Sequence, residues 1–517
     1  MDPLTSIWVC IKVCLGILAC LGVYVLAEFL VLPQCRKRSM GKYSNLRTSK
    51  SLMNNMADMK RNIKENKYIF WHFIELRLTE ENYDIFYIVR GNTTSFFLTS
   101  VKAYEEFKQL QPDVIDRKIN PQKTFTKLSP SAFGNIKSGK EWSKRRNSVS
   151  KLMVLNKSSQ YIPMMVQSLD AEIRTWKIGQ DINVNQRISA ITLMIITKIL
   201  FGSDITSKIE DCDYLHPDGK STKMKFMDFY PKMILDIMST FSNIKANIFP
   251  FLGIYDLVEP FVTNRKNINQ FQDKLKKFLA NSTDAGSVYR KLIDEFKIPE
   301  EDAFQDICGL LFAGHDTTSH GISSAIYFLK KNPEADKKLR DALATCGITK
   351  DTDYFTIETK EKIQSCEYLN YVIKETLRID PPAFSSIVYE ASKPITLVGV
   401  PIKKSESILL NILSFHHDPS QWHEPLKFIP ERFDPESEYF LKPDGNARSP
   451  YAYAPFSFGL RKCPGQILAT LELKFLLSRF LCTADIEIPE SLLQNDYARF
   501  ALFSNFHLEG KVTYKSG

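Results

Sequence analysis

The chain has 517 residues, of which 44% are hydrophobic and 25% are charged, and this composition excludes both wholesale disorder and a multi-span membrane protein. Its 68 basic and 59 acidic residues leave a net charge of +9 that is spread along the sequence. An excess this diffuse does not indicate nucleic-acid binding, but it suits an acidic protein partner or an anionic membrane surface.

The first predicted element is an apolar run at residues 6–32, which only Lys12 and Glu28 interrupt. It is long enough for one tilted membrane span, and the basic sequence CRKR that follows it predicts a cytoplasmic location for the rest of the chain. A cleaved signal peptide is the alternative, but the basic residues lie behind the apolar run and no small-x-small site ends it. We expect residues 1–32 to form a signal anchor.

No repeat, low-complexity tract or flexible linker divides the remainder, so residues 33–517 are expected to form one large domain. The ten cysteines have no CxxC spacing, and in a reducing compartment most of them should be free thiols.

Three helices are predicted in the second half of the chain. Residues 299–332 have acidic side chains at one end and lysines at the other, which favours a single helix about 50 Å long. Residues 361–378 predict a second helix that ends before Pro381, and residues 465–482 carry apolar side chains at helical spacing. Short β-like runs lie at 386–391, 395–400 and 407–413. The predicted class is mainly α with minor β.

The stretch FSFGLRKCPG, residues 456–465, surrounds Cys463 with features that a buried structural cysteine does not need. Gly459 and Gly465 permit tight backbone, and Gly465 opens the last helix, whose N-terminus favours a thiolate. Arg461 adds positive charge. An axial heme thiolate needs amide donors toward sulfur and a cation for the acidic propionates. The local pattern alone leaves both interpretations open.

The pattern FxxGxRxCxG, made by Phe456, Gly459, Arg461, Cys463 and Gly465, resembles the heme-binding loop of the cytochrome P-450 monooxygenases. Four further stretches resemble that family's signatures in the expected order: KEWSKRR at 140–146, AGHDTT at 313–318, ETLR at 375–378 and PERF at 430–433. The resemblance implies the fold of that family, a single large helical domain with small sheets around a buried heme, which is heme b (iron protoporphyrin IX).

The resemblance also implies roles on both sides of the heme. Cys463 would be the proximal iron ligand, and its thiolate would favour cleavage of bound dioxygen. Asp316 and Thr317 would manage protons on the distal side, the alternative being the polar face of a buried helix. Gly314 beside Ala313 would remove bulk and let the helix open locally.

Other residues would hold the cofactor and its loop. Trp142 and Arg146 have the WxxxR spacing that the family uses against a heme propionate. Glu375, Arg378 and Arg432 would form a buried ion network on the proximal side, and losing one partner would cost about 3 to 5 kcal/mol.

Two positions depart from the family pattern. Ala313 stands where one branch carries a glutamate that esterifies the heme, so no covalent link is expected there. Many members place an arginine for a propionate soon after the ExxR helix, and the corresponding position here is Tyr389.

The resemblance places the substrate pocket along residues 313–317, 383–388 and 500–503, whose apolar side chains predict a lipophilic substrate. Part of residues 224–262 is expected to dip into the bilayer as a substrate entrance, with a plain pair of core helices as the alternative.

No dinucleotide fingerprint occurs, so electrons are expected from the membrane NADPH–cytochrome P-450 reductase, with a small b-type cytochrome as a further candidate partner. The predicted docking residues are Lys140, Lys144, Arg145 and Lys462, and the predicted location is the endoplasmic reticulum membrane. Two alternatives to a monooxygenase stay open: a relative that rearranges a peroxide or dehydrates an oxime without reductase, and a heme protein that only binds a ligand.

Overall fold

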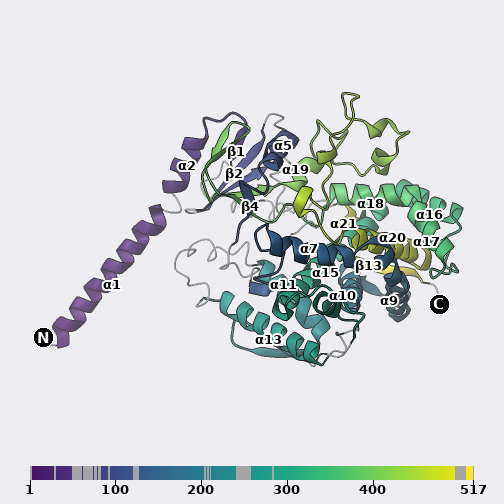
Figure 1. Ribbon diagram of the computed structural model, residues 1–517, viewed down its shortest axis with the longest axis horizontal. Helices are drawn as coiled ribbons and strands as arrows, with labels where there is room; N and C mark the ends of the chain where they lie inside the picture. Colours follow the sequence, from purple (N-terminus) through teal and green to yellow (C-terminus); the bar gives the residue numbers. More distant parts are fainter. Residues whose placement is uncertain are drawn as a thin grey trace.

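The computed structural model describes residues 3–27, 31–48, 61, 74, 78–79, 83–90, 93–119, 127–202, 205, 209, 211–239, 258–281, 284–494 and 508–515. A sheet-rich part and a larger helical part lie against each other, and the N-terminal helix stands off this body (Figure 1).

Helix α15 (Glu300–Lys331) runs through the helical part and organises its packing. It follows Pro299, has three acidic residues in its first turn, and ends at Asn332 after two lysines, so the predicted single helix over 299–332 is confirmed. The helices that pack on it most extensively are α10 (Val184–Phe201), α20 (Gln466–Thr483) and α18 (Glu367–Ile379). The main hydrophobic core fills the space between these helices.

The other helices surround this group. They are α5 (Val101–Gln109), α7 (Lys140–Leu152), α8 (Leu155–Ser158), α9 (Ile162–Thr175), α11 (Phe226–Ser239), α13 (Phe261–Ala280), α14 (Val288–Asp294), α16 (Pro333–Thr345), α17 (Ile357–Ser365), α19 (Ile412–His416) and α21 (Glu490–Leu493). Helix α20 begins after Gly465 and ends at Thr483, as the apolar periodicity predicted.

The main sheet has six strands in the order β1-β2-β3-β11-β8-β4. These are β1 (Leu46–Thr48), β2 (Ile85–Arg90), β3 (Thr93–Leu98), β4 (Ile115–Arg117), β8 (Tyr389–Ala391) and β11 (Ser407–Leu410). In the antiparallel pair at its end, Arg117 of β4 lies directly opposite Tyr389 of β8. This register brings together two residues that are far apart in the sequence.

Three smaller sheets complete the described part of the chain. They join β9 (Ile395–Leu397) with β10 (Val400–Ile402), β6 (Cys212–Leu215) with β7 (Ser221–Met224), and β13 (Glu509–Lys515) with both β5 (Asp181–Asn183) and β12 (Ala484–Glu487).

The single helix predicted over 361–378 is wrong, because α17 and α18 are separate helices that meet at Cys366. The backbone of Cys366 is extended, with φ −64° and ψ 101°. The side-chain amide of Asn370 donates across this break to the carbonyls of Gln364 and Cys366, at 3.2 and 3.0 Å.

Helix α1 (Pro3–Leu26) exposes large apolar side chains along its length, and α2 (Leu32–Met40) follows it. Among the described residues, the one helix that passes a membrane-span criterion of length and hydropathy is α10, and 72% of it is buried inside the protein. Helix α10 is therefore a core helix, whereas the apolar stretch Ile11–Tyr24 within α1 falls short of that criterion by length.

Candidate functional site

The loop that carries Cys463 precedes α20, and a backbone hydrogen bond between its own residues closes it. The amide of Cys463 donates to the carbonyl of Phe456 at 2.9 Å, and Ser457 and Gly459 take left-handed backbone conformations with φ of +58° and +61°. Gly465 caps α20, and its amide donates to the Cys463 sulfur. The predicted amide donor toward sulfur and the tight turn are thus both present.

Cys463 is an exposed residue, although the surrounding protein encloses its thiol closely enough for burial to act on it. Burial raises the pKa of this thiol, while the Gly465 amide and the cations of Arg146 and Lys462 lower it. Because burial is the largest effect, the sulfur keeps its proton until another positive charge compensates the thiolate. A metal cation bound to sulfur supplies such a charge.

Arg146 and Trp142, both on α7, support the loop. The guanidinium of Arg146 donates to the carbonyls of Lys462 and Leu460, at 2.6 and 3.2 Å. The ring of Trp142 lies under the guanidinium of Arg461, with 4.2 Å from its centroid to Cζ. Within the protein, both side chains therefore hold the loop and its cation.

A second buried cation, Arg117, lies near Arg461 and was not predicted from the sequence. The guanidinium of Arg117 lies 4.6 Å from the centroid of the Tyr389 ring, and only 5% of Arg117 is exposed. Burial and the neighbouring Arg117 cation lower the pKa of Arg461 to about 10. The Nε of Arg461 and the Nε and Nη1 of Arg117 are buried donors without a partner.

Asp116 pairs with Arg461 at 3.2 Å, but three donors of the two adjoining buried cations remain unpaired. These donors suit an anionic acceptor with several oxygens, because buried N–H groups and like charges are costly when uncompensated. A heme carries two carboxylates and an iron cation. The guanidinium pair and the sulfur therefore fit such a group.

The AGHDTT stretch lies in the middle of α15. Ala313 is exposed and Thr317 half-buried, while Asp316 is buried, and the four-residue spacing puts Ala313 and Thr317 on one face of the helix. The Thr317 hydroxyl donates to the Ala313 carbonyl at 2.6 Å.

The expected local opening at Gly314 does not occur, because α15 is continuous there. A Cβ on this residue would lie 2.9 Å from Cδ1 of Ile196 on α10, so the glycine permits close helix packing instead.

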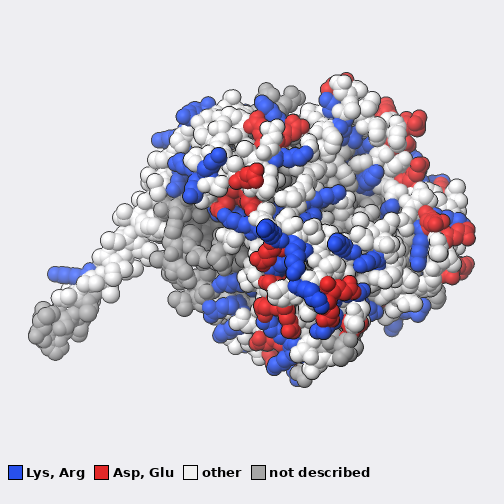
Figure 2. Space-filling view, in the orientation of Figure 1, with Lys and Arg blue, Asp and Glu red and all other residues white. Residues whose placement is uncertain are grey.

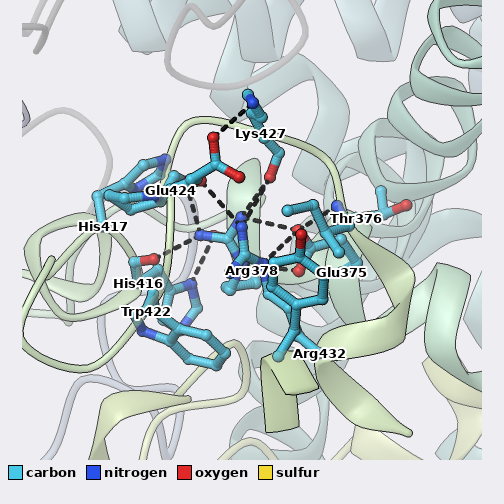
Figure 3. A network of polar contacts seen from close by, with 12 residues as sticks. Glu375, Thr376, Arg378, His416, His417, Trp422, Glu424, Lys427 and Arg432 are labelled. Carbon is cyan, nitrogen blue, oxygen red and sulfur yellow. Dashed lines mark hydrogen bonds and ion pairs between the residues drawn. The ribbon is translucent and has the colours of Figure 1, made fainter. Parts of the chain in front are cut away.

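Figure 3 shows the ion network that was predicted from ETLR and PERF. Arg378 donates to both carboxylate oxygens of Glu375, at 2.7 and 2.8 Å, and Arg432 donates to one of them at 3.1 Å. All three side chains have no exposed surface. Backbone carbonyls, among them those of His416, Pro425 and Lys427, accept the remaining arginine donors.

His416, which the sequence reading also missed, connects this network to the cysteine loop. Its Nε2 accepts from the amide of Ala454 at 2.8 Å, so Nδ1 carries the proton and donates to the carbonyl of Arg378 at 2.9 Å. Burial, together with His417 and Arg378, lowers the pKa of His416 well below its usual range, which keeps the ring neutral. The connection reaches the chain two residues before Phe456.

Arg145 is wrongly predicted as a docking residue. It is 1% exposed, and it pairs with Asp306 at 2.6 Å and Asp302 at 3.1 Å, both on α15. Lys140, Lys144 and Lys462 are exposed. Of the predicted pocket, residues 500–503 lie outside the described residues, whereas 313–317 and 383–388 are described. Of the predicted entrance at 224–262, residues 240–257 lie outside the described residues. Within the described residues, the cysteines are free thiols, and no group of His, Cys, Asp or Glu could by itself hold a metal ion.

The mainly helical fold and the site define an oxidoreductase of the heme-thiolate type. The chain belongs to the cytochrome P450 family, whose model matches residues 65–504.

Relatives come from animals and plants. Cytochrome P450 4X1 of Mus musculus is 31% identical over 350 residues, which are 64% of this chain and 65% of that protein. Cytochrome P450 3A31 of Mesocricetus auratus is 26% identical over 370 residues, 67% and 68% of the two chains. Cytochrome P450 CYP82J17 of Trigonella foenum-graecum is 26% identical over 348 residues, 63% of each. The family implies a heme-iron cofactor and monooxygenase chemistry.

Proposed function

We propose that the protein inserts one oxygen atom of dioxygen into a lipophilic substrate, with electrons from an NADPH reductase. The observation that carries the proposal is the Cys463 loop, where the sulfur of an exposed cysteine receives a backbone amide and lies near Arg146 and Lys462. A structural cysteine needs neither accessibility nor these charges.

The cofactor in this proposal is heme b, with Cys463 as its proximal ligand. Arg117 and Arg461 would take its propionates with their unpaired donors, and Arg117 would replace the arginine expected at Tyr389. Trp142 and Arg146 would orient Arg461 and the loop, and Phe456, Gly459 and Gly465 would shape its turn. Ala313 would face the distal side without a covalent bond, since its side chain offers no carboxylate, and Gly314 beside it would let α15 pack closely on α10.

A bound heme supplies reductive activation of dioxygen. On the distal side, Asp316 would supply protons. The Thr317 hydroxyl would form the last hydrogen bond of the chain along which these protons move. The bond from Thr317 to the Ala313 carbonyl fixes its hydroxyl toward its own helix and leaves its lone pairs free to accept. These two side chains carry the proton transfer in this proposal.

The reductase would dock where exposed lysines flank the cysteine loop. Lys140 and Lys144 are on α7, and Lys462 precedes the ligand cysteine. On the face drawn in Figure 2, Lys and Arg side chains gather over the region that α7 occupies in Figure 1. An acidic flavin domain complements such a surface.

The membrane attachment rests on α1, whose side chains are largely exposed, Trp8 by 61% and Val23 by 67%. We propose that α1 spans the endoplasmic reticulum membrane and that the body faces the cytoplasm, where lipophilic substrates and the reductase are both at hand.

The test is turnover in phospholipid vesicles that contain the reductase and a lipid extract, under ¹⁸O₂. The proposal predicts ¹⁸O-labelled products that require NADPH and reductase. Product formation from a lipid hydroperoxide without either would instead establish the rearranging type. If the protein binds heme but NADPH is oxidised slowly with every electron-donor protein that is tried, the result would favour a protein that only binds a ligand.

A further inference from the structure

A buried polar cluster lies one turn beyond the acid and alcohol of α15. The ring Nε2 of His320 is 2.9 Å from Oδ2 of Asp380, and the Ser324 hydroxyl donates to the same oxygen. His320 and Asp380 are 6% and 5% exposed. Asp380 caps the C-terminus of α18, so the cluster joins α15 to the helix that carries Glu375 and Arg378.

The helix geometry places this cluster beside the proton-handling residues. His320 follows Asp316 by four residues and Thr317 by three, and these are the spacings at which side chains on a helix surface are neighbours. His320 also lies seven residues, about two turns, after the exposed Ala313. The cluster is therefore on the face of α15 that holds the distal residues.

The titratable groups that act on His320 are Asp380, which caps the C-terminus of α18, and Asp316, which is on α15 itself. From α20, the apolar side chain of Leu473 packs on Gly321, the residue after His320. Burial lowers the pKa of His320, but the two carboxylates together hold it above its usual value. The two carboxylates therefore favour the imidazolium form of His320 in a buried place next to Asp316.

We propose that His320, held by Asp380 and Ser324, is a positioning residue for Asp316, and that its charge sets how readily Asp316 gives up a proton toward Thr317. A neighbouring cation makes a carboxylic acid stronger, because it stabilises the carboxylate that remains. The proposal rests on the proposed function, since it concerns proton delivery in the same reaction.

The test uses the full-length protein with reductase in phospholipid vesicles and measures hydrogen peroxide released per NADPH oxidised, without added substrate. When protons reach the distal side slowly, reduced dioxygen leaves as peroxide rather than as water. The imidazolium loses its proton as the pH rises, so the wild-type peroxide fraction should increase with pH, through a transition above the ordinary histidine range.

Four variants separate charge from structure. His320→Gln should release several-fold more peroxide at neutral pH and lose the pH transition. Asp380→Asn should shift the transition to lower pH, because it removes a carboxylate that favours the imidazolium. Ser324→Ala removes a hydrogen bond but no charge, and it should keep the transition. In the double variant His320→Gln, Asp380→Asn, the unfolding temperature should recover relative to the singles, but the pH transition should not.

Two failures are distinguishable. A wild-type protein that binds no heme or oxidises no NADPH would overturn the proposed function. A wild type that turns over, together with a His320→Gln variant whose peroxide fraction and pH profile match it, would overturn the role of His320 alone.

Discussion

The pairing of Arg117 with Tyr389 is the basis of our proposal that a missing arginine is replaced from the opposite strand. The family's arginine position holds a tyrosine here, yet the register of β4 and β8 places the Arg117 guanidinium on the face of that tyrosine ring. The residue that carries the positive charge is thus 272 positions earlier in the chain than Tyr389. Sequence patterns near position 389 contain no sign of it.

This arrangement predicts opposite effects of Arg117→Leu on the empty and the loaded protein. Without heme, the variant should unfold at the same or a higher temperature, because it removes the cation that acts on Arg461. With heme, it should release the cofactor several-fold faster to apomyoglobin, because one propionate partner is lost. Tyr389→Phe, which keeps the ring, is the matched control. Equal release rates for Arg117→Leu and wild type would contradict the assignment.

At the scale of elements, the features that depend on neighbouring residues in the sequence were predicted correctly. The ends of α15 and α20 follow from acidic and basic turns, a glycine cap and apolar spacing, and the Cys463 loop is contiguous in sequence. The break at Cys366 was missed because it depends on where one side-chain amide, that of Asn370, finds its acceptors. Arg117 and His416 were missed because tertiary contacts, not spacing, bring them to the site.

Helix α20 contains a carboxyl group whose environment predicts a pH effect. Glu472 is buried, its Oε2 has no partner, and burial raises its pKa to about 8. The folded state therefore holds this proton more tightly than the unfolded state, whose glutamate titrates near about 4.3. The stabilisation that this proton binding contributes is fully present below that pH. Between that pH and about pH 8, the free energy of unfolding falls by about 1.4 kcal/mol per pH unit.

Glu472→Gln removes this titration. Between about pH 5 and about pH 8, the unfolding temperature of the variant should fall by less than that of wild type. Circular dichroism measures both temperatures. The exposed Glu487→Gln serves as the control and should behave as wild type. A wild-type loss that Glu472→Gln leaves unchanged would place the cause elsewhere.

For the whole molecule, α1 stands away from a body that packs around α15, whereas α10, which is also apolar, is buried in the core (Figure 1). Deleting residues 3–26 should therefore reduce flotation of the protein with phospholipid vesicles but leave heme binding intact. Any flotation that remains would come from a second membrane contact on the body. Undiminished flotation would contradict the anchor.

The central claim concerns Cys463, and one measurement addresses it directly. The difference spectrum of the dithionite-reduced protein with and without carbon monoxide reports the ligand opposite carbon monoxide. The account predicts a Soret band at the thiolate-heme position that is lost or displaced in Cys463→Ser. A wild-type band at the position of a histidine-ligated heme, or the same thiolate band in Cys463→Ser, would contradict it.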